Sequence, residues 1–223
     1  MTNIKMVVFD MAGTTVNEDN VVYKTLHKAI NKSGVSVDLD TVLEFGAGKE
    51  KFKAIQDVLI ALSNKTVDAQ VIFEDFKTML DDEYKVLNVK PIDGVETVML
   101  QLKGDNIKVV LNTGYNSKIA NLLLEKLHWK KGTHYDALIT ADDVVNGRPH
   151  PDMILKAMKL MGIEEAATVL KAGDSAIDIE EGKNANCGIT VGVLSGAQTR
   201  EQIEKENPTY IIDSLASLTE VIN

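Results

Sequence analysis

Short apolar segments alternate with longer amphipathic segments along the second half of the chain, and this alternation constrains the fold most strongly. The short segments are rich in valine, isoleucine and leucine, while the longer ones repeat apolar residues at helical spacing. Strands separated by helices of about ten or more residues predict a parallel sheet covered by helices. The predicted strands are residues 107–111, 137–140, 168–170 and 189–193, the predicted helices are residues 94–103, 117–127, 151–161 and 176–186, and a helix, a strand and a helix complete the chain.

The first strand of this sheet is separated from the others by a helical insertion. Met6–Phe9 is a short apolar run followed by an acidic residue, as expected for a buried parallel strand. Residues 19–87 contain no proline and no convincing strand, and their apolar residues recur at the spacing of about four helices. We therefore predict a doubly wound α/β core of residues 1–15 and 88–223, with residues 16–87 as a helical domain inserted after the first strand.

The composition narrows the partners that such a chain can have. The 24 basic and 33 acidic residues give a net charge of −9, which repels nucleic acid and anionic lipid, so we expect neither as a partner. Cys187 is the single cysteine, which excludes an internal disulfide and cysteine-rich zinc sites. The amino-terminal apolar run is too short for a signal peptide, and no stretch approaches the length of a membrane span. We expect a cytoplasmic protein that acts on a small molecule.

Polar motifs follow four of the predicted strands. They are Asp10–Thr15, Asn112–Tyr115, Gly147–Pro151 and Gly173–Asp178. Ligands of open parallel sheets bind beyond the carboxyl ends of the strands, so these motifs are expected to form one site. A carboxylate nucleophile, a hydroxyl group beside backbone N–H groups, a cation and two further acids suit metal-assisted phosphoryl transfer.

The order and spacing of these motifs resemble the haloacid dehalogenase (HAD) superfamily across essentially the whole chain. The resemblance implies a Rossmann-like core with a helical cap after the first motif. It also implies that Asp10 attacks phosphorus and forms an aspartyl-phosphate. Mg²⁺ would be held by the Asp10 carboxylate, the Ala12 carbonyl and Asp174, with Asp178 as a further ligand or as support for the ligands. Such oxygen ligands suit Mg²⁺.

The same resemblance assigns residues to the phosphoryl group. Thr113 and the N–H group of Gly114 would hold phosphoryl oxygens, and Thr14 would add a phosphate contact from the first motif. Arg148 would neutralise charge between the nucleophile and the phosphoryl group. The catalytic set expected from these motifs is therefore Asp10, Thr113 and Arg148.

Ala12 separates this sequence from most phosphatases of the superfamily, which carry there the aspartate that protonates the leaving group. The sequence resembles instead the phosphonoacetaldehyde hydrolase (phosphonatase) family, which cleaves a C–P bond and uses a cap lysine to form a Schiff base with the aldehyde. That family has a glycine followed three residues later by the lysine, a spacing that Gly46 and Lys49 meet, and a tyrosine at the position of Tyr115. We therefore expect Lys49 to be catalytic and Gly46 and Tyr115 to contact the substrate.

Three positions depart from the phosphonatase pattern. Phe52 replaces a histidine three residues after the lysine, and Phe45 replaces a methionine before the glycine. The family also has a cysteine near the start of the cap, at about the position of Asn20 in this sequence. The loss of the histidine removes a proton carrier. Two roles for Lys49 therefore remain open, a Schiff base and a plain contact with the substrate.

The expected function is that of a Mg²⁺-dependent hydrolase, phosphonatase-like, acting on a small phosphonate or phosphorylated metabolite. One alternative is a phosphomonoesterase, of the phosphoglycolate or sugar-phosphate type, with an atypical general acid. A second alternative is a phosphorylated signalling domain without enzymatic activity, but such domains are shorter and place their aspartate on a middle strand. A homodimer is compatible with the sequence.

Overall fold

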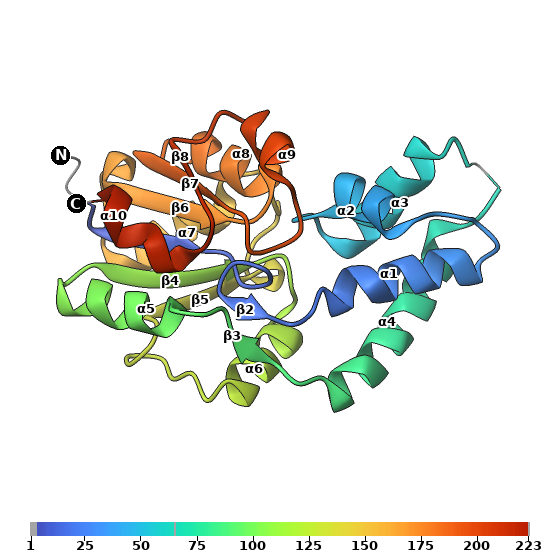
Figure 1. Cartoon of the computed structure of the whole chain (residues 1–223), viewed down its shortest axis with the longest axis horizontal. Helices are drawn as coiled ribbons and strands as arrows, with labels where there is room; N and C mark the ends of the chain where they lie inside the picture. The colour runs from blue at the N-terminus through green and yellow to red at the C-terminus, as the bar shows by residue number, and fades with distance from the viewer. Residues whose placement is uncertain (1–3, 65, 223) are drawn as a thin grey trace.

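The computed structural model describes residues 4–64 and 66–222. Six parallel strands form one sheet in the order β5-β4-β1-β6-β7-β8 (Figure 1). The strands are β1 (Met6–Phe9), β4 (Lys108–Thr113), β5 (Ala137–Thr140), β6 (Val169–Gly173), β7 (Ile189–Val193) and β8 (Tyr210–Ile212). This confirms the predicted parallel α/β fold.

Helices cover both faces of the sheet, which explains why the first strand is wholly apolar. Met6 and Val8 face α7 (Asp152–Met161), while Val7 and Phe9 belong to the core that includes α5 (Val95–Gly104). Successive side chains of a strand point to opposite faces, so both faces of β1 must be apolar. The other helices of this part are α6 (Ser117–Lys126), α8 (Ala176–Asn184), α9 (Arg200–Glu204) and α10 (Leu218–Ile222), with 3-10 turns at Ala141–Asp143, Ala166–Thr168 and Leu215–Ser217.

Strand β1 lies at the centre of the sheet, where the strand order reverses direction. Phe9 is paired with Leu111 of β4 and with Ala172 of β6. The residues that follow on the three strands therefore lie side by side at one edge. A reversal of strand order leaves a crevice at that edge, where ligands of such sheets bind.

Four helices form a separate segment at the right of Figure 1, which we call the helical segment. Its helices pack around apolar residues that include Leu26, Ile55 and Phe76. They are α1 (Val21–Lys32), α2 (Leu39–Gly46), α3 (Lys51–Ala61) and α4 (Ala69–Val86). The predicted number of helices in this region is confirmed.

A short antiparallel pair of strands joins the helical segment to the rest of the molecule. Strand β2 (Val16–Asn17) pairs with β3 (Lys90–Pro91). Strands of two residues have no periodicity to read, so sequence analysis did not detect them. None of the helices in the described ranges is long and apolar enough to cross a membrane.

Candidate active site

Asp10 follows β1 and lies against Arg148. Its N–H group donates to the carbonyl of Ala172 at 3.0 Å, which continues the sheet pairing and fixes the backbone. The Arg148 Nη1 atom lies 2.7 Å from Asp10 Oδ1, and both side chains are almost fully buried. Burial raises the pKa of Asp10, and the positive charge of Arg148 opposes this rise.

A buried network of charges holds Arg148 in place. Its Nε lies 3.0 Å from Glu181, and its Nη2 donates to the side-chain oxygen of Asn112 at 2.6 Å. Lys171, inside β6, contacts Asp178 at 2.9 Å, Glu181 at 3.2 Å and Asn112 at 2.7 Å. Fully buried charges are tolerated when they are paired in this way.

Lys171, Glu181 and the side chain of Asn112 were not predicted from the sequence to be part of this network. A lysine within the apolar strand Val169–Gly173 was the available signal, because lysine is rarely buried without a partner. The same polar residues explain why β4 and β6 extend beyond the apolar runs that predicted them. Asn112, Thr113 and Lys171 are strand residues whose polarity serves the site.

Three carboxylates are placed to hold a metal ion. Ligand oxygens of Asp10, Asp174 and Asp178 lie within 4.8 Å of one another, and all three residues are buried. Burial and the negative charges of Asp10 and Asp178 raise the pKa of Asp174 well above its usual range. With Glu181 included, four carboxylates lie near three cations, because Arg148 and Lys171 pair with three of them and Lys51 lines the same cavity as Asp10 and Asp174. A divalent cation would compensate the remaining negative charge, and the oxygen ligands fit Mg²⁺.

Asp178 and Asp174 have different hydrogen-bonding partners, and Ala12 lies near them in the wall of a small cavity. Asp178 also lies 3.0 Å from Arg148 Nη1 and accepts the Ser175 hydroxyl at 2.5 Å, so it is tied into the charge network. Asp174 accepts the N–H group of Ala197 at 2.6 Å. Ala12 lines the same small cavity as Asp10 and Asp174. The identity of the ligands stays a prediction.

That cavity also contains the residues expected to bind a phosphoryl group. Thr113, Gly114 and Tyr115 line it, and the Thr113 hydroxyl oxygen accepts the N–H group of Tyr115 at 3.2 Å. The hydroxyl proton of Thr113 is then available to a phosphoryl oxygen. Thr14 is buried, and its hydroxyl has no hydrogen-bonding partner among the described residues. It is also absent from the described residues that line the cavity. We call this cavity the catalytic cavity. Its lining residues are Asp10, Ala12, Tyr23, Gly48, Lys51, Thr113, Gly114, Tyr115, Arg148 and Asp174.

The two lysines near the glycines of the helical segment lie in different places. The Lys49 amino group is 2.7 Å from Asp57 Oδ2, whereas Lys51 lines the catalytic cavity. The Lys51 amino group donates to the carbonyl of Lys49 at 2.7 Å and lies 4.9 Å from the centre of the Tyr23 ring. Burial lowers the pKa of Lys51 to about 8, which makes it a better nucleophile at neutral pH than an exposed lysine.

The structure therefore brings Lys51, and not Lys49, to the other candidate catalytic residues. Gly48 and Lys51 have the same spacing as Gly46 and Lys49, so the motif fits the sequence in two registers, and the prediction of Lys49 corresponds to the first of them. Gly46 ends α2 and packs against Ala54 instead of facing the cavity, and an added Cβ atom would lie 3.3 Å from the Ala54 Cβ.

Gly48 brings the helical segment into close contact with the sheet part. Its φ of +75° is the left-handed conformation that favours glycine, and a Cβ atom there would collide with Ile177. Its N–H group donates to the hydroxyl of Tyr23 at 2.9 Å. Tyr23, Gly48 and Lys51 thus form the side of the catalytic cavity that the helical segment contributes.

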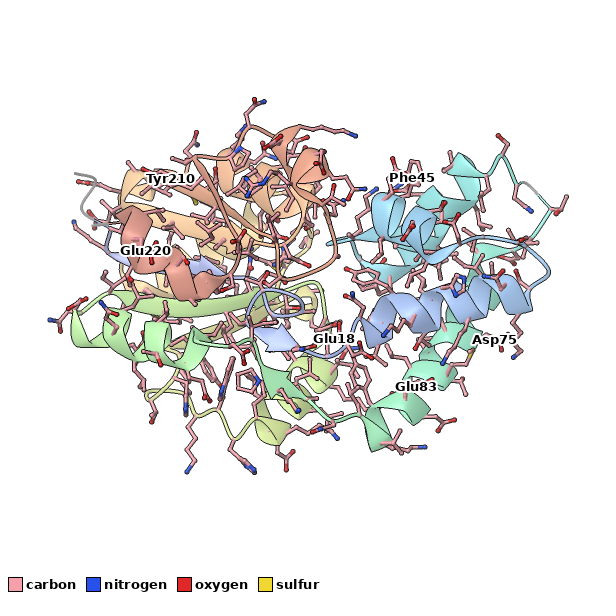
Figure 2. The ribbon with its side chains drawn as sticks, in the orientation of Figure 1. Glu18, Phe45, Asp75, Glu83, Tyr210 and Glu220 are labelled. Atoms are coloured by element: carbon pink, nitrogen blue, oxygen red, sulfur yellow. The ribbon has the colours of Figure 1, made fainter. Side chains whose placement is uncertain are left out.

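Glu18 lies where the helical segment meets the sheet part (Figure 2) and was not singled out by its sequence context. It is 1% exposed, and its carboxyl oxygens have no hydrogen-bonding partner among the described residues. Burial raises its pKa to about 8, although the nearby backbone N–H groups of Val22 and Val21 and the positive charge of Lys51 oppose the shift. Burial of Glu18 therefore favours the protonated form of its carboxyl group.

The fold and this arrangement of residues define a HAD-type hydrolase, and comparison with known proteins agrees. The chain belongs to the haloacid dehalogenase-like hydrolase family, whose model matches residues 7–192. The protein is therefore an enzyme of the hydrolase class.

Particular relatives lie within this family. A phosphonoacetaldehyde hydrolase of Bacillus cereus is 31% identical over 216 residues, covering 90% of this chain and 81% of its relative. The phosphonoacetaldehyde hydrolase of Latilactobacillus sakei is 29% identical, with 88% and 78% of the two chains covered. The crystal structure of a phosphonoacetaldehyde hydrolase-like protein from Oleispira antarctica matches with a TM-score of 0.84 and 25% identity, over 99% of this chain and 91% of that one.

Proposed function

We propose that this hydrolase is a Mg²⁺-dependent phosphonatase that cleaves the C–P bond of a small phosphonate with a carbonyl group next to its phosphorus-bearing carbon. The observation that carries the proposal is that Lys51 and Asp10 line one small cavity. The similarity to phosphonoacetaldehyde hydrolases supports it. In this proposal the helical segment acts as the cap of the active site.

Lys51 would prepare the substrate for C–P cleavage. Its amine adds to the carbonyl carbon and water is lost, which leaves a protonated imine. When the C–P bond breaks, its electron pair moves into this imine and gives an enamine on Lys51. Hydrolysis of the enamine then releases the carbonyl product and restores the amine. The lowered pKa of Lys51 supports the first step, because only the unprotonated amine adds to a carbonyl.

Asp10 would receive the phosphoryl group. Its carboxylate attacks phosphorus as the C–P bond breaks, and water later releases phosphate from the aspartyl-phosphate. Arg148, 2.7 Å from Asp10, and the donors of Thr113 and Gly114 would stabilise the charge on the phosphoryl oxygens. Mg²⁺, held by Asp10, Asp174 and the Ala12 carbonyl with Asp178 beside them, would lower the repulsion between the nucleophile and the phosphoryl group.

Ala12 fits this chemistry better than ester hydrolysis. An alkoxide leaving group needs an acid near the scissile bond, and alanine cannot supply a proton. An enamine leaving group needs none, because the imine accepts the electrons. The alanine in the cavity wall is thus compatible with the presence of Lys51 in the same wall.

Trapping the imine tests the proposal. Borohydride added with phosphonoacetaldehyde should inactivate the enzyme and leave a stable added mass on Lys51, with Lys49 in the same digest as the internal control. Phosphonoacetaldehyde alone and borohydride alone should leave activity intact. Rapid hydrolysis of phosphate esters with no labelled lysine would contradict the proposal in favour of a phosphomonoesterase.

A further inference from the structure

A second cavity, of about 460 Å³, lies beside the catalytic cavity, between α4 and the start of α6. We call it the side cavity. It shares Lys51, Gly114 and Tyr115 with the catalytic cavity, so the two adjoin at these residues. The rest of its apolar lining is Val22, Phe73, Phe76 and Leu80 from the helical segment and Ile119 and Ala141 from the sheet part.

Three polar side chains on the wall of the side cavity cap or bind backbone groups of the protein. Glu50 accepts two N–H groups at the start of α3, at 3.0 Å each. Asn116 accepts the N–H group of Ile119 at 2.9 Å. Asp142 accepts both the N–H and the hydroxyl groups of Ser117 at 2.8 Å. These oxygen atoms already accept hydrogen bonds from groups of the protein.

The other charged side chains of the wall are paired with one another or with a neighbour. Lys118 on α6 lies 3.3 Å from Asp81 on α4, an ion pair that joins the two parts of the molecule. Lys77 lies 2.8 Å from Glu74. The lining that a ligand would meet in the side cavity is therefore mainly apolar, with Lys51 and Tyr115 at the junction with the catalytic cavity.

We propose that the side cavity binds an apolar organic group of the substrate, so that the substrate is a 2-oxoalkylphosphonate whose carbonyl carbon carries an aryl or branched alkyl group. This inference rests on the proposed function, because it places the phosphoryl group beside Asp10. Lys51 stands on the wall common to both cavities. A carbonyl carbon bound there directs its phosphorus-bearing carbon toward Asp10 and its other substituent into the side cavity.

The size of the side cavity supports a substituent larger than hydrogen. Small-molecule sites have volumes of about 300–1,000 Å³, and the side cavity falls within this range. The three non-hydrogen atoms of an acetaldehyde body take roughly 90 Å³, at about 30 Å³ for each water-sized group. Phosphonoacetaldehyde would leave most of the side cavity without contacts.

A substrate series tests the inference. The 2-oxoalkylphosphonates in which the carbonyl substituent is hydrogen, methyl, isobutyl or phenyl differ only in the group assigned to the side cavity. We expect kcat/KM to rise at least about tenfold from methyl to isobutyl or phenyl, as each buried methylene group contributes about tenfold or more. A flat or falling series would overturn the inference.

Variants that fill the side cavity provide a second readout. Ala141→Phe and Leu80→Trp reduce its volume from opposite walls. Each should lower the ratio of activity on the phenyl compound to activity on the methyl compound by at least about tenfold. Leu100→Trp, at an exposed position of α5, is the matched control and should leave this ratio unchanged. Because Leu80→Trp can disturb packing, Ala141→Phe keeps the test decisive; an unchanged ratio there would overturn the inference.

The outcomes separate this inference from the function on which it rests. Methyl, isobutyl and phenyl phosphates are assayed in parallel with the phosphonates. If phosphonoacetaldehyde is hydrolysed fast and the larger phosphonates are not, the side-cavity inference alone fails. If no phosphonate is cleaved, the proposed function fails, and the inference fails with it.

Discussion

The Lys49 amino group lies 2.7 Å from Asp57 Oδ2, while the Lys51 amino group, two residues on, lies in the catalytic cavity. Asp57 also contacts Lys53 at 2.6 Å, so this carboxylate holds two lysines outside the cavity. The flanking lysines lower the pKa of Asp57 despite its partial burial. The ion pairs with Asp57 thus keep Lys49 and Lys53 away from the catalytic cavity, which Lys51 lines.

Substitution of these lysines should separate their roles. Lys51→Arg keeps the positive charge but cannot form an imine, so we expect phosphonatase activity to fall by about a thousandfold or more. Lys49→Arg keeps a partner for Asp57 and should stay within about threefold of the wild type. The measurements are kcat and KM for phosphonoacetaldehyde. Equal losses in the two variants would argue against the assignment of Lys51.

Asp10→Asn should abolish turnover without unfolding the protein. Asparagine is a poor nucleophile, and we expect activity to fall to background. Arg148 keeps Asp178 and Glu181 as partners, and the variant removes one of several crowded negative charges. The melting temperature without metal should therefore be unchanged or higher. Residual activity above a few per cent of wild type would contradict the nucleophilic role.

Mg²⁺ should stabilise the folded protein through Asp174. A ligand that binds only the folded state adds about 2.7 kcal/mol at a hundred times its Kd. We expect Mg²⁺ to raise the melting temperature of the wild type and to have little effect on Asp174→Ala, whose activity should need much more Mg²⁺. Asp178→Ala should raise the Mg²⁺ requirement less.

Asp174→Ala and Asp178→Ala should also differ in the stability of the metal-free protein. Asp178→Ala removes a partner of buried Arg148 and Lys171, a loss of about 3–5 kcal/mol in similar buried pairs. Asp174→Ala removes a carboxyl group whose pKa is raised by burial and by the charges of Asp10 and Asp178, so it should not destabilise the metal-free protein to the same extent. Thermal unfolding in EDTA measures both effects. In a separate assay, wild-type activity that is the same in EDTA as in Mg²⁺ would exclude the metal role.

Glu18 should make the stability fall as the pH rises. Its pKa is about 4.5 in the unfolded chain and about 8 in the folded protein, so the folded state binds more protons between these values. The stabilisation relative to an ionised carboxyl is complete below about pH 4.5 and is lost as the pH rises through about 8. The penalty accumulated over this interval is on the order of a few kcal/mol.

Glu18→Gln tests this linkage because glutamine keeps the size and does not ionise. The free energy of unfolding, measured by urea denaturation from pH 5 to 8, should fall less steeply in Glu18→Gln than in the wild type. Glu44→Gln, at an exposed carboxyl group, is the control and should retain the wild-type slope. Identical slopes in all three proteins would show that Glu18 is ionised in the folded state.

Ala12→Asp should shift activity from phosphonates toward phosphate esters. Ala12 lines the catalytic cavity, where a new carboxyl group could protonate an alkoxide. General acids contribute about 10²–10⁴-fold, so we expect phosphate-ester hydrolysis to rise by at least tenfold. Ala12→Asn adds a similar volume without an acid and should give no such gain. A rise in both variants would point to a change of shape rather than to proton transfer.

The amino-acid sequence by itself determined the fold class and grouped most residues of the candidate site. Buried parallel strands must be apolar on both faces, so Met6–Phe9 and Ile189–Val193 are readable as strands without their partners. Motifs at the ends of such strands must meet at one edge of the sheet. Asp10, Thr113, Arg148 and Asp174 could therefore be grouped before any contact was known.

The tertiary structure alone decided which lysine of Lys49 and Lys51 enters the catalytic cavity. Both follow a glycine at the same spacing, and only the ion pair with Asp57 and the approach of Gly48 to Ile177 distinguish them. Glu18 likewise gave no signal, because its burial arises from packing between distant segments. Local periodicity encodes which face of an element is buried, but partners distant in sequence decide where a charged side chain lies.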